Sequence, residues 1–155
     1  MSIKFGIVGP GKIADRSLAP AIGAVDGARL WSVTSRSLSR AEEFATKHGA
    51  SGTSPAFDDY EAMLDDPSLD AVVISTPDKL HGDQGIVAAN AGKHVFMEKP
   101  MTASSEEGQR LLRACNANGV KLGVAYHLRW HRGHRKLVER VHGGEIGKIH
   151  HARHK

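Results

Sequence analysis

Apolar residues fall into short runs, separated by segments in which they recur at helical spacing. The short runs predict strands at residues 3–8, 30–34, 71–75 and 94–97. The helical spacing predicts helices at residues 12–25, 39–48, 60–64 and 80–91. Strands that alternate with helices in this way form a parallel sheet with helices on both faces. We therefore expect an α/β fold with a doubly wound parallel sheet.

Two further elements continue this alternation. Ser104 or Ser105 is suited to cap a helix over residues 104–118, and Gly119 stands just beyond its end. A further strand is expected at residues 121–125. The sheet is thus expected to continue to residue 125.

The last part of the chain has a different pattern. Helical spacing recurs over residues 130–141, two glycines follow, and residues 146–150 predict a last strand. A strand without a partner exposes an edge that recruits other chains, and a terminal segment without packing frays. We therefore expect self-association, and so a homo-oligomer, or fraying beyond residue 143.

The composition is that of one globular domain, with 155 residues of which 40% are hydrophobic and 25% charged. Cys115 is the single cysteine, so an internal disulfide is excluded and a buried structural thiol is expected. No charged-then-apolar signal precedes the first strand, and the apolar runs are far shorter than the roughly 20 residues of a membrane span. These features predict a cytoplasmic protein without a membrane partner.

Charge is uneven along the chain, although the formal net charge is only +4. Residues 121–155 hold 9 basic residues, two acidic residues and seven of the ten histidines. His127, His131 and His134 have i, i+4, i+7 spacing, which would align them on one helix face and suit Zn²⁺ or Ni²⁺. No cysteine or carboxylate is interleaved with them. Aromatic platforms for nucleic acid are almost absent from the basic end, which has only Tyr126 and Trp130. We expect neither a metal nor a nucleic-acid partner.

A glycine-rich turn follows the first expected strand. It reads G-x-G-x-x-A and consists of Gly9, Pro10, Gly11, Lys12, Ile13 and Ala14. The first glycine permits a tight turn, the second lets the backbone approach a pyrophosphate, and the small third residue lets helix and strand pack closely. The helix N-terminus adds free N–H groups and a partial positive charge. The motif predicts a dinucleotide site; the alternative is a turn whose glycines serve geometry alone.

The loop after the second strand indicates which dinucleotide binds. An NAD site normally places Asp or Glu here for the ribose hydroxyl, whereas this chain has Ser35, Arg36 and Arg40 and no carboxylate between them. Guanidinium and hydroxyl groups bind a 2′-phosphate through charge-assisted hydrogen bonds. The loop therefore favours NADP over NAD, unless Ser39 merely caps the helix and the arginines are solvated.

Polar residues also follow the strand at residues 71–75, at the edge where ligands bind in such sheets. Ser75, Thr76 and Pro77 end this strand, and His81 comes within the next turn. We expect these residues to line the ribose or nicotinamide, with a surface histidine as the equal alternative for His81.

Glu98 and Lys99 end the strand at residues 94–97, at the same edge. A lysine with a carboxylate beside it can polarise a hydroxyl or carbonyl that undergoes hydride transfer, or bind a sugar hydroxyl. The alternative is a surface ion pair.

These segments together resemble the glucose-fructose oxidoreductase / inositol dehydrogenase (Gfo/Idh/MocA) family. The resemblance rests on the glycine turn, on Ser75-Thr76-Pro77 with His81, and above all on A-G-K-H-V-F-M-E-K-P at residues 91–100. It implies a Rossmann domain that binds NAD or NADP, with Glu98 beside the nicotinamide and a catalytic Lys99 in the substrate site. It also gives Tyr126 and His127 as substrate-site candidates, although Ala125 stands where the family frequently has asparagine.

The resemblance further implies a division of the chain. Residues 1–125 correspond to the NAD(P)-binding Rossmann domain, and residues 126–155 to a connecting helix and the start of a second domain on an open antiparallel sheet. Most of that substrate domain lies outside this sequence. We expect the cofactor half of an NADP-dependent oxidoreductase that transfers hydride between nicotinamide and a sugar or polyol. The alternative is a nucleotide-binding module without catalytic activity.

Overall fold

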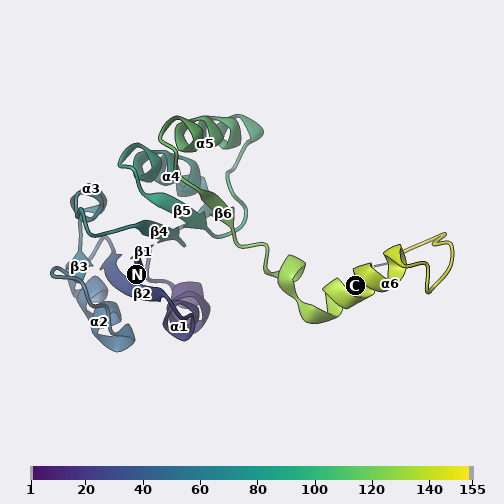
Figure 1. The fold of residues 1–155 in the computed structure, drawn as a ribbon. Coiled ribbons are helices and arrows are strands. Elements are labelled where there is room, and N and C mark those ends of the chain that lie inside the picture. The colour runs from purple at the N-terminus through teal and green to yellow at the C-terminus, as the bar shows by residue number, and fades with distance from the viewer. Residues whose placement is uncertain (1, 154–155) are drawn as a thin grey trace. The chain divides into compact units, whose positions relative to one another are not determined.

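The computed structural model describes residues 2–153, and the chain divides into two compact units between Ala125 and Tyr126. The first unit contains one six-stranded, wholly parallel sheet with the strand order β3-β2-β1-β4-β5-β6 (Figure 1). Its strands are β1 (Ile3–Val8), β2 (Ala28–Thr34), β3 (Ala56–Phe57), β4 (Ala71–Ile74), β5 (His94–Met97) and β6 (Leu122–Val124). The order reverses at β1, so the doubly wound fold expected from the sequence is confirmed.

Helices cover both faces of this sheet. They are η1 (Ala14–Leu18), α1 (Ala19–Ala24), α2 (Leu38–His48), α3 (Tyr60–Leu64), η2 (Asp78–Leu80), α4 (His81–Asn90) and α5 (Ser105–Ala117). Ile22 of α1 and Phe44 of α2 pack in one apolar cluster with the sheet, whereas Ala88 of α4 and Leu111 of α5 pack in a second cluster. Burial of apolar surface in these two layers holds the sheet between the helices.

Register places the carboxyl ends of the central strands at one edge. Val8 lies opposite both Thr34 of β2 and Ile74 of β4, and Ile74 lies opposite Met97 of β5. The segments that follow these strands therefore begin side by side. Because the strand order reverses between β1 and β4, this edge is where such sheets open a ligand crevice.

The helical segment after the glycine turn differs from the single helix expected over residues 12–25. Its first part, η1, is π-helical: the Ala19 N–H donates to the Ala14 carbonyl, five residues back. Pro20 follows in the first turn of α1. Proline has no N–H for the carbonyl four residues earlier, which interrupts the regular α-helical ladder at this point.

The start of α5 agrees with the sequence. Ser104 caps the helix, because its Oγ accepts a hydrogen bond from the Glu107 N–H at 3.2 Å. The Glu107 carboxylate in turn accepts from the Ala103 N–H at 3.1 Å. Beyond the helix end, Gly119 has φ +65°, a left-handed conformation that favours glycine.

Cys115 of α5 and Lys93, which directly precedes β5, are both buried. Cys115 is 2% exposed, and burial raises the pKa of its thiol, as expected of a structural cysteine. Lys93, the lysine of the A-G-K-H-V string, is also buried, and its Nζ donates to the carbonyls of Asp66 at 2.7 Å and Leu69 at 3.0 Å. The Lys93 side chain therefore holds the loop that precedes β4 through two of its backbone carbonyls.

The second unit contains η3 (His127–Trp130) and α6 (Arg132–His142). The strand predicted at residues 146–150 is wrong, since residues 147–150 have no regular secondary structure. A strand needs a neighbour for its backbone hydrogen bonds, and no described segment pairs with this one. The exposed strand edge on which the expected self-association rested is therefore not formed.

The histidines of the second unit are not aligned along one helix. His127 lies in η3, and His131 interrupts the helical path with ψ 122° before α6 begins. Within residues 2–153, no group of three or more His, Cys, Asp or Glu side chains is placed to hold a metal ion. In the same part of the chain, every helix is too short or too polar to cross a membrane.

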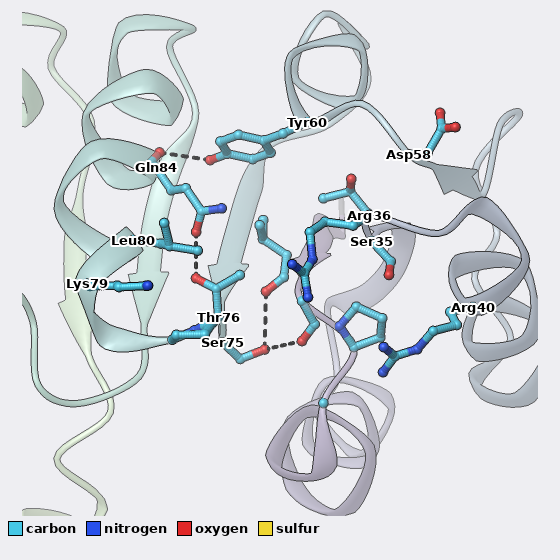
Figure 2. Close-up of a pocket in the computed structure, with 16 residues that line it drawn as sticks. Ser35, Arg36, Arg40, Asp58, Tyr60, Ser75, Thr76, Lys79, Leu80 and Gln84 are labelled. Atoms are coloured by element: carbon cyan, nitrogen blue, oxygen red, sulfur yellow. Dashed lines mark hydrogen bonds between the residues drawn. The ribbon is translucent and has the colours of Figure 1, made fainter.

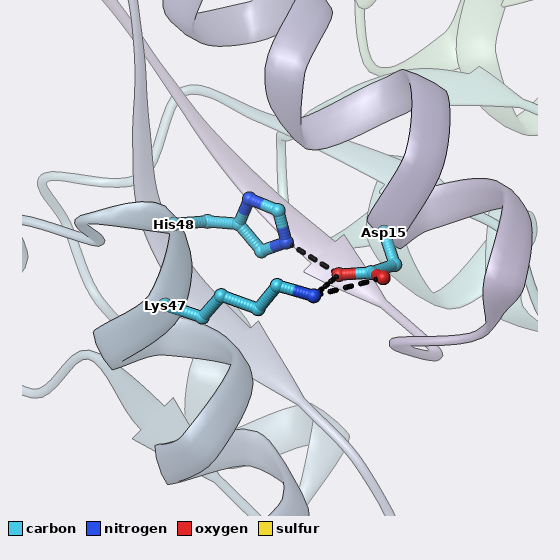
Figure 3. A network of polar contacts seen from close by, with 3 residues as sticks. All are labelled: Asp15, Lys47 and His48. Atoms are coloured by element: carbon cyan, nitrogen blue, oxygen red, sulfur yellow. Dashed lines mark hydrogen bonds and ion pairs between the residues drawn. The ribbon is translucent and has the colours of Figure 1, made fainter.

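A polar network joins η1 to the end of α2 (Figure 3). The Asp15 carboxylate accepts from Lys47 Nζ at 2.7 and 3.0 Å and lies 2.7 Å from His48 Nε2. Lys47 first, and then His48, holds the pKa of Asp15 below its ordinary value of 3.8. A depressed carboxyl pKa contributes stability that is present above pH 3.8 and is lost as the pH falls through the folded-state pKa.

Asp15→Asn should therefore lower the melting temperature at neutral pH, and the gap to the unsubstituted protein should close as the pH falls below 4. Thermal unfolding followed by circular dichroism across this range measures the effect. Asp26→Asn removes an exposed carboxylate at the end of α1 and is the matched control. A gap that stays constant with pH would show that the network contributes no charge-dependent stability.

Candidate nucleotide-binding site

A cavity of about 490 Å³ opens at the carboxyl edge of the sheet, around the ends of β1, β2 and β4 (Figure 2). It lies at the point where the strand order reverses. Nine residues predicted for the cofactor line it: Gly9, Pro10, Gly11, Ser35, Arg36, Arg40, Ser75, Thr76 and Pro77. Three segments that are far apart in the sequence thus form one cavity.

The glycine turn lines this cavity, and its two glycines differ in their surroundings. Gly9 has φ +85°, and a Cβ there would lie 2.8 Å from Thr76 Cγ2. Ser75 Oγ also donates to the Gly9 carbonyl at 2.8 Å. At Gly11 a Cβ would meet only the Gly9 carbonyl oxygen, at 4.0 Å. Gly9 is therefore required by the fold, whereas Gly11 leaves space open beside the cavity.

The other residues of the motif lie outside the cavity lining. Ala14 is fully buried in the apolar cluster under η1 and α1, where its small side chain permits close packing. Lys12 and Ile13 are exposed at the start of the helical segment. Their backbone N–H groups belong to the first helical turn, which leaves donors free for an anion.

Positive side chains approach the cavity from two sides. Figure 2 shows Arg36 and Arg40 entering from the β2 side and Lys79 lying across from them. Asp58, from the segment after β3, also lines the cavity, and Figure 2 shows its carboxylate at the periphery. Three cations against one carboxylate give a cavity that attracts anions such as phosphate.

Sequence reasoning missed the wall formed by α3 and α4. Tyr60 and Gln84 line the cavity, and the Tyr60 hydroxyl donates to the Gln84 carbonyl at 2.9 Å. Thr76 Oγ1 donates to Gln84 Oε1 at 2.5 Å, which fixes the segment after β4 against α4. Burial raises the pKa of Tyr60, so its hydroxyl keeps the proton that it donates. Leu80 completes this wall.

His81 is not a surface histidine. It is 1% exposed, and both ring nitrogens lie within hydrogen-bond distance of backbone carbonyls. His81 does not line the cavity. Leu80 and Gln84, its neighbours along the chain, do line it.

Glu98 and Lys99 follow β5 at the same sheet edge but do not line the cavity. The Glu98 N–H donates to the Ile74 carbonyl at 2.9 Å, which keeps the start of this segment next to the end of β4. The Glu98 carboxylate accepts from the Lys99 backbone N–H at 3.2 Å. The Lys99 side chain is exposed.

The remaining candidates, Tyr126 and His127, lie in the second unit, at the start of η3. Both side chains are exposed.

Comparison with known proteins assigns the chain to a family. Residues 3–126 match the GFO_IDH_MocA model, which describes an oxidoreductase family with an NAD-binding Rossmann fold. The chain belongs to this family. Residues 3–126 correspond to the NAD-binding Rossmann domain of the family, and the resemblance seen in the sequence is confirmed.

Relatives within the Gfo/Idh/MocA family include enzymes named for each nicotinamide cofactor. The chain is 37% identical to scyllo-inositol 2-dehydrogenase (NADP(+)) IolU of Bacillus subtilis, over 95% of the chain and 43% of that protein. It is 35% identical to scyllo-inositol 2-dehydrogenase (NAD(+)) of the same organism, over 94% of the chain and 42% of that protein. A nicotinamide nucleotide is thus the common cofactor, although these names do not select NADP or NAD.

A solved structure of another protein has the same fold. KijD10, a 3-ketoreductase from Actinomadura kijaniata solved with TDP-benzene and NADP, superposes with a TM-score of 0.89 at 31% identity. The match covers 96% of this chain and 46% of KijD10. The chain therefore spans less than half the length of the relatives that it matches.

Proposed function

We propose that this domain binds NADP(H) in preference to NAD(H) and serves hydride transfer between the nicotinamide and a sugar or polyol. The observation that carries the cofactor preference is the pair Arg36 and Arg40 in the cavity wall, with no carboxylate at the end of β2. A ribose 2′-phosphate is favoured by guanidinium groups and disfavoured by an acid at this position. The NADP complexes of KijD10 are consistent with this preference.

In this proposal, different residues around the cavity bind different parts of the nucleotide. The pyrophosphate lies against the glycine turn, where the backbone N–H groups of Lys12 and Ile13 in the first helical turn bind it. Ser35, Arg36 and Arg40 hold the 2′-phosphate, and Lys79 adds a positive charge from the opposite wall. Ser75, Thr76 and Pro77 face the ribose next to the nicotinamide. Glu98 lies beside the ring.

Lys99 is the residue that acts on the substrate in this proposal. A nicotinamide nucleotide held in the cavity would accept or supply the hydride. In the direction of reduction, the Lys99 ammonium would hydrogen-bond the carbonyl oxygen and give it a proton as hydride adds to the carbon. In the direction of oxidation, the neutral Lys99 amine would accept the hydroxyl proton as hydride leaves the carbon. The polyol and keto substrates of the relatives carry such an oxygen.

Arginine substitutions test the cofactor preference. One charge-assisted hydrogen bond contributes roughly 1.5–3 kcal/mol, so Arg36→Ala or Arg40→Ala should weaken NADPH binding about tenfold or more and leave NADH nearly unchanged. Fluorescence titration with each cofactor measures both dissociation constants. Arg29→Ala removes an exposed arginine at the opposite end of β2 and is the matched control. Equal losses for both cofactors in both variants would refute a 2′-phosphate contact.

A further inference from the structure

His81 is the first residue of α4, and its ring bridges two loops at the active edge of the sheet. Its Nδ1 lies 2.7 Å from the carbonyl oxygen of Pro100, and its Nε2 lies 2.9 Å from the carbonyl oxygen of Thr76. Both distances are those of hydrogen bonds. Whichever ring nitrogen carries the proton, at least one N–H donates to a carbonyl of these loops.

These contacts occupy both ring nitrogens, and the ring does not face the cavity. His81 is 1% exposed and does not line the cavity. Its partners lie five and nineteen residues away along the chain, in the segments after β4 and β5. The ring therefore connects tertiary neighbours, and is more than a local cap of its own helix.

We propose that His81 is a positioning residue that fixes the loop carrying Lys99 against the loop that lines the nucleotide cavity. Thr76 belongs to the cavity wall, and Pro100 directly follows Lys99. A buried, rigid imidazole between their carbonyls sets the separation of the two loops. The catalytic part of this role rests on the proposed function of Lys99, whereas the tie between the loops is a property of the free protein.

The strand ladder alone does not hold this separation. The last backbone bond between the two strands joins the Glu98 N–H to the Ile74 carbonyl. Beyond it, Pro77, Lys99 and Pro100 are all exposed. Thr76 and Pro100 therefore meet at His81 where direct pairing between the strands has ended.

Hydrogen exchange in the protein without nucleotide tests the tie directly. The amides of Glu98, Lys99 and Ala103 each donate a hydrogen bond and so report on the loop. Loss of one hydrogen bond in His81→Ala should speed exchange at residues 98–103 about fivefold to tenfold and leave β1 and β2 unchanged. Added imidazole should enter the vacated space and restore protection. His142→Ala, at an exposed histidine of α6, is the control.

His81→Phe separates the effect of the lost hydrogen bonds from the effect of the lost ring volume. It also tests the proposal if the alanine variant fails to fold. It retains a ring but no N–H donor, so residues 98–103 should exchange fast and imidazole should have no effect. Protection equal to that of the unsubstituted protein in His81→Phe would overturn the proposal, as would acceleration spread evenly over the sheet. Titration of the unsubstituted protein with NADPH is a separate readout: its failure would refute the proposed function and leave this result standing.

Discussion

Gly11→Val is expected to abolish measurable NADPH binding while the domain stays folded. The space beside Gly11 is open, since a Cβ there would meet only the Gly9 carbonyl at 4.0 Å. The fold can accept a branched side chain, but that side chain would occupy the place where the backbone approaches the pyrophosphate. We expect affinity to fall by at least about 100-fold, or roughly 2.7 kcal/mol. Fluorescence titration and circular dichroism measure affinity and fold.

Two further glycine variants sharpen this result. Gly23→Val makes the same change on α1, where nothing lies within 4 Å of an added Cβ, and should bind NADPH normally. Gly9→Ala should instead lower the stability of the fold, because φ is +85° and the new Cβ would lie 2.8 Å from Thr76 Cγ2. Unchanged NADPH affinity in folded Gly11→Val would show that the turn has only a structural role.

Lys99→Ala should reduce turnover with a sugar or polyol substrate by roughly 10²–10⁴-fold, the usual contribution of a group that assists proton transfer. The Lys99 side chain is exposed and lies outside the nucleotide cavity. NADPH affinity should therefore change less than about twofold. Steady-state rates over a panel of sugars and polyols, with parallel cofactor titration, measure both quantities.

Lys121→Ala is the control for this experiment, because it removes an exposed lysine at the opposite end of the sheet, just before β6. It should leave turnover and NADPH affinity unchanged. Turnover in Lys99→Ala that matches the control would exclude Lys99 from the reaction.

The sheet could be predicted because its signals are local. Each central strand is an apolar run with a turn after it, and Ser104 and Gly119 carry the chemistry of a helix start and end. The errors come from interactions that no local pattern records. β3 is not among the strands predicted from the sequence, because it has only two residues and is defined by its pairing with β2. Residues 146–150 look like a strand, but no described strand pairs with them.

The site, too, has residues that local sequence signals predict and residues that they do not. The glycine turn and the Ser35, Arg36 and Arg40 loop follow strands directly, so the topology alone brings them to one edge. Tyr60 and Gln84 instead line the cavity from two helices. A hydrogen bond joins these two residues, which are 24 positions apart in the chain. The environment of His81 depends on Pro100, nineteen residues later. Such contacts arise only from tertiary packing, so the sequence could not separate a surface histidine from a buried one.

The most direct test of a preference for NADP is parallel titration of the purified protein with NADPH and NADH under identical salt conditions. We expect saturable binding of both, with NADPH tighter by at least about tenfold, because the 2′-phosphate gains a charge-assisted bond to Arg36 or Arg40. The preference should weaken as ionic strength rises, since Arg36 and Arg40 are exposed. NADH binding as tightly as NADPH, or no binding of either, would contradict this assignment.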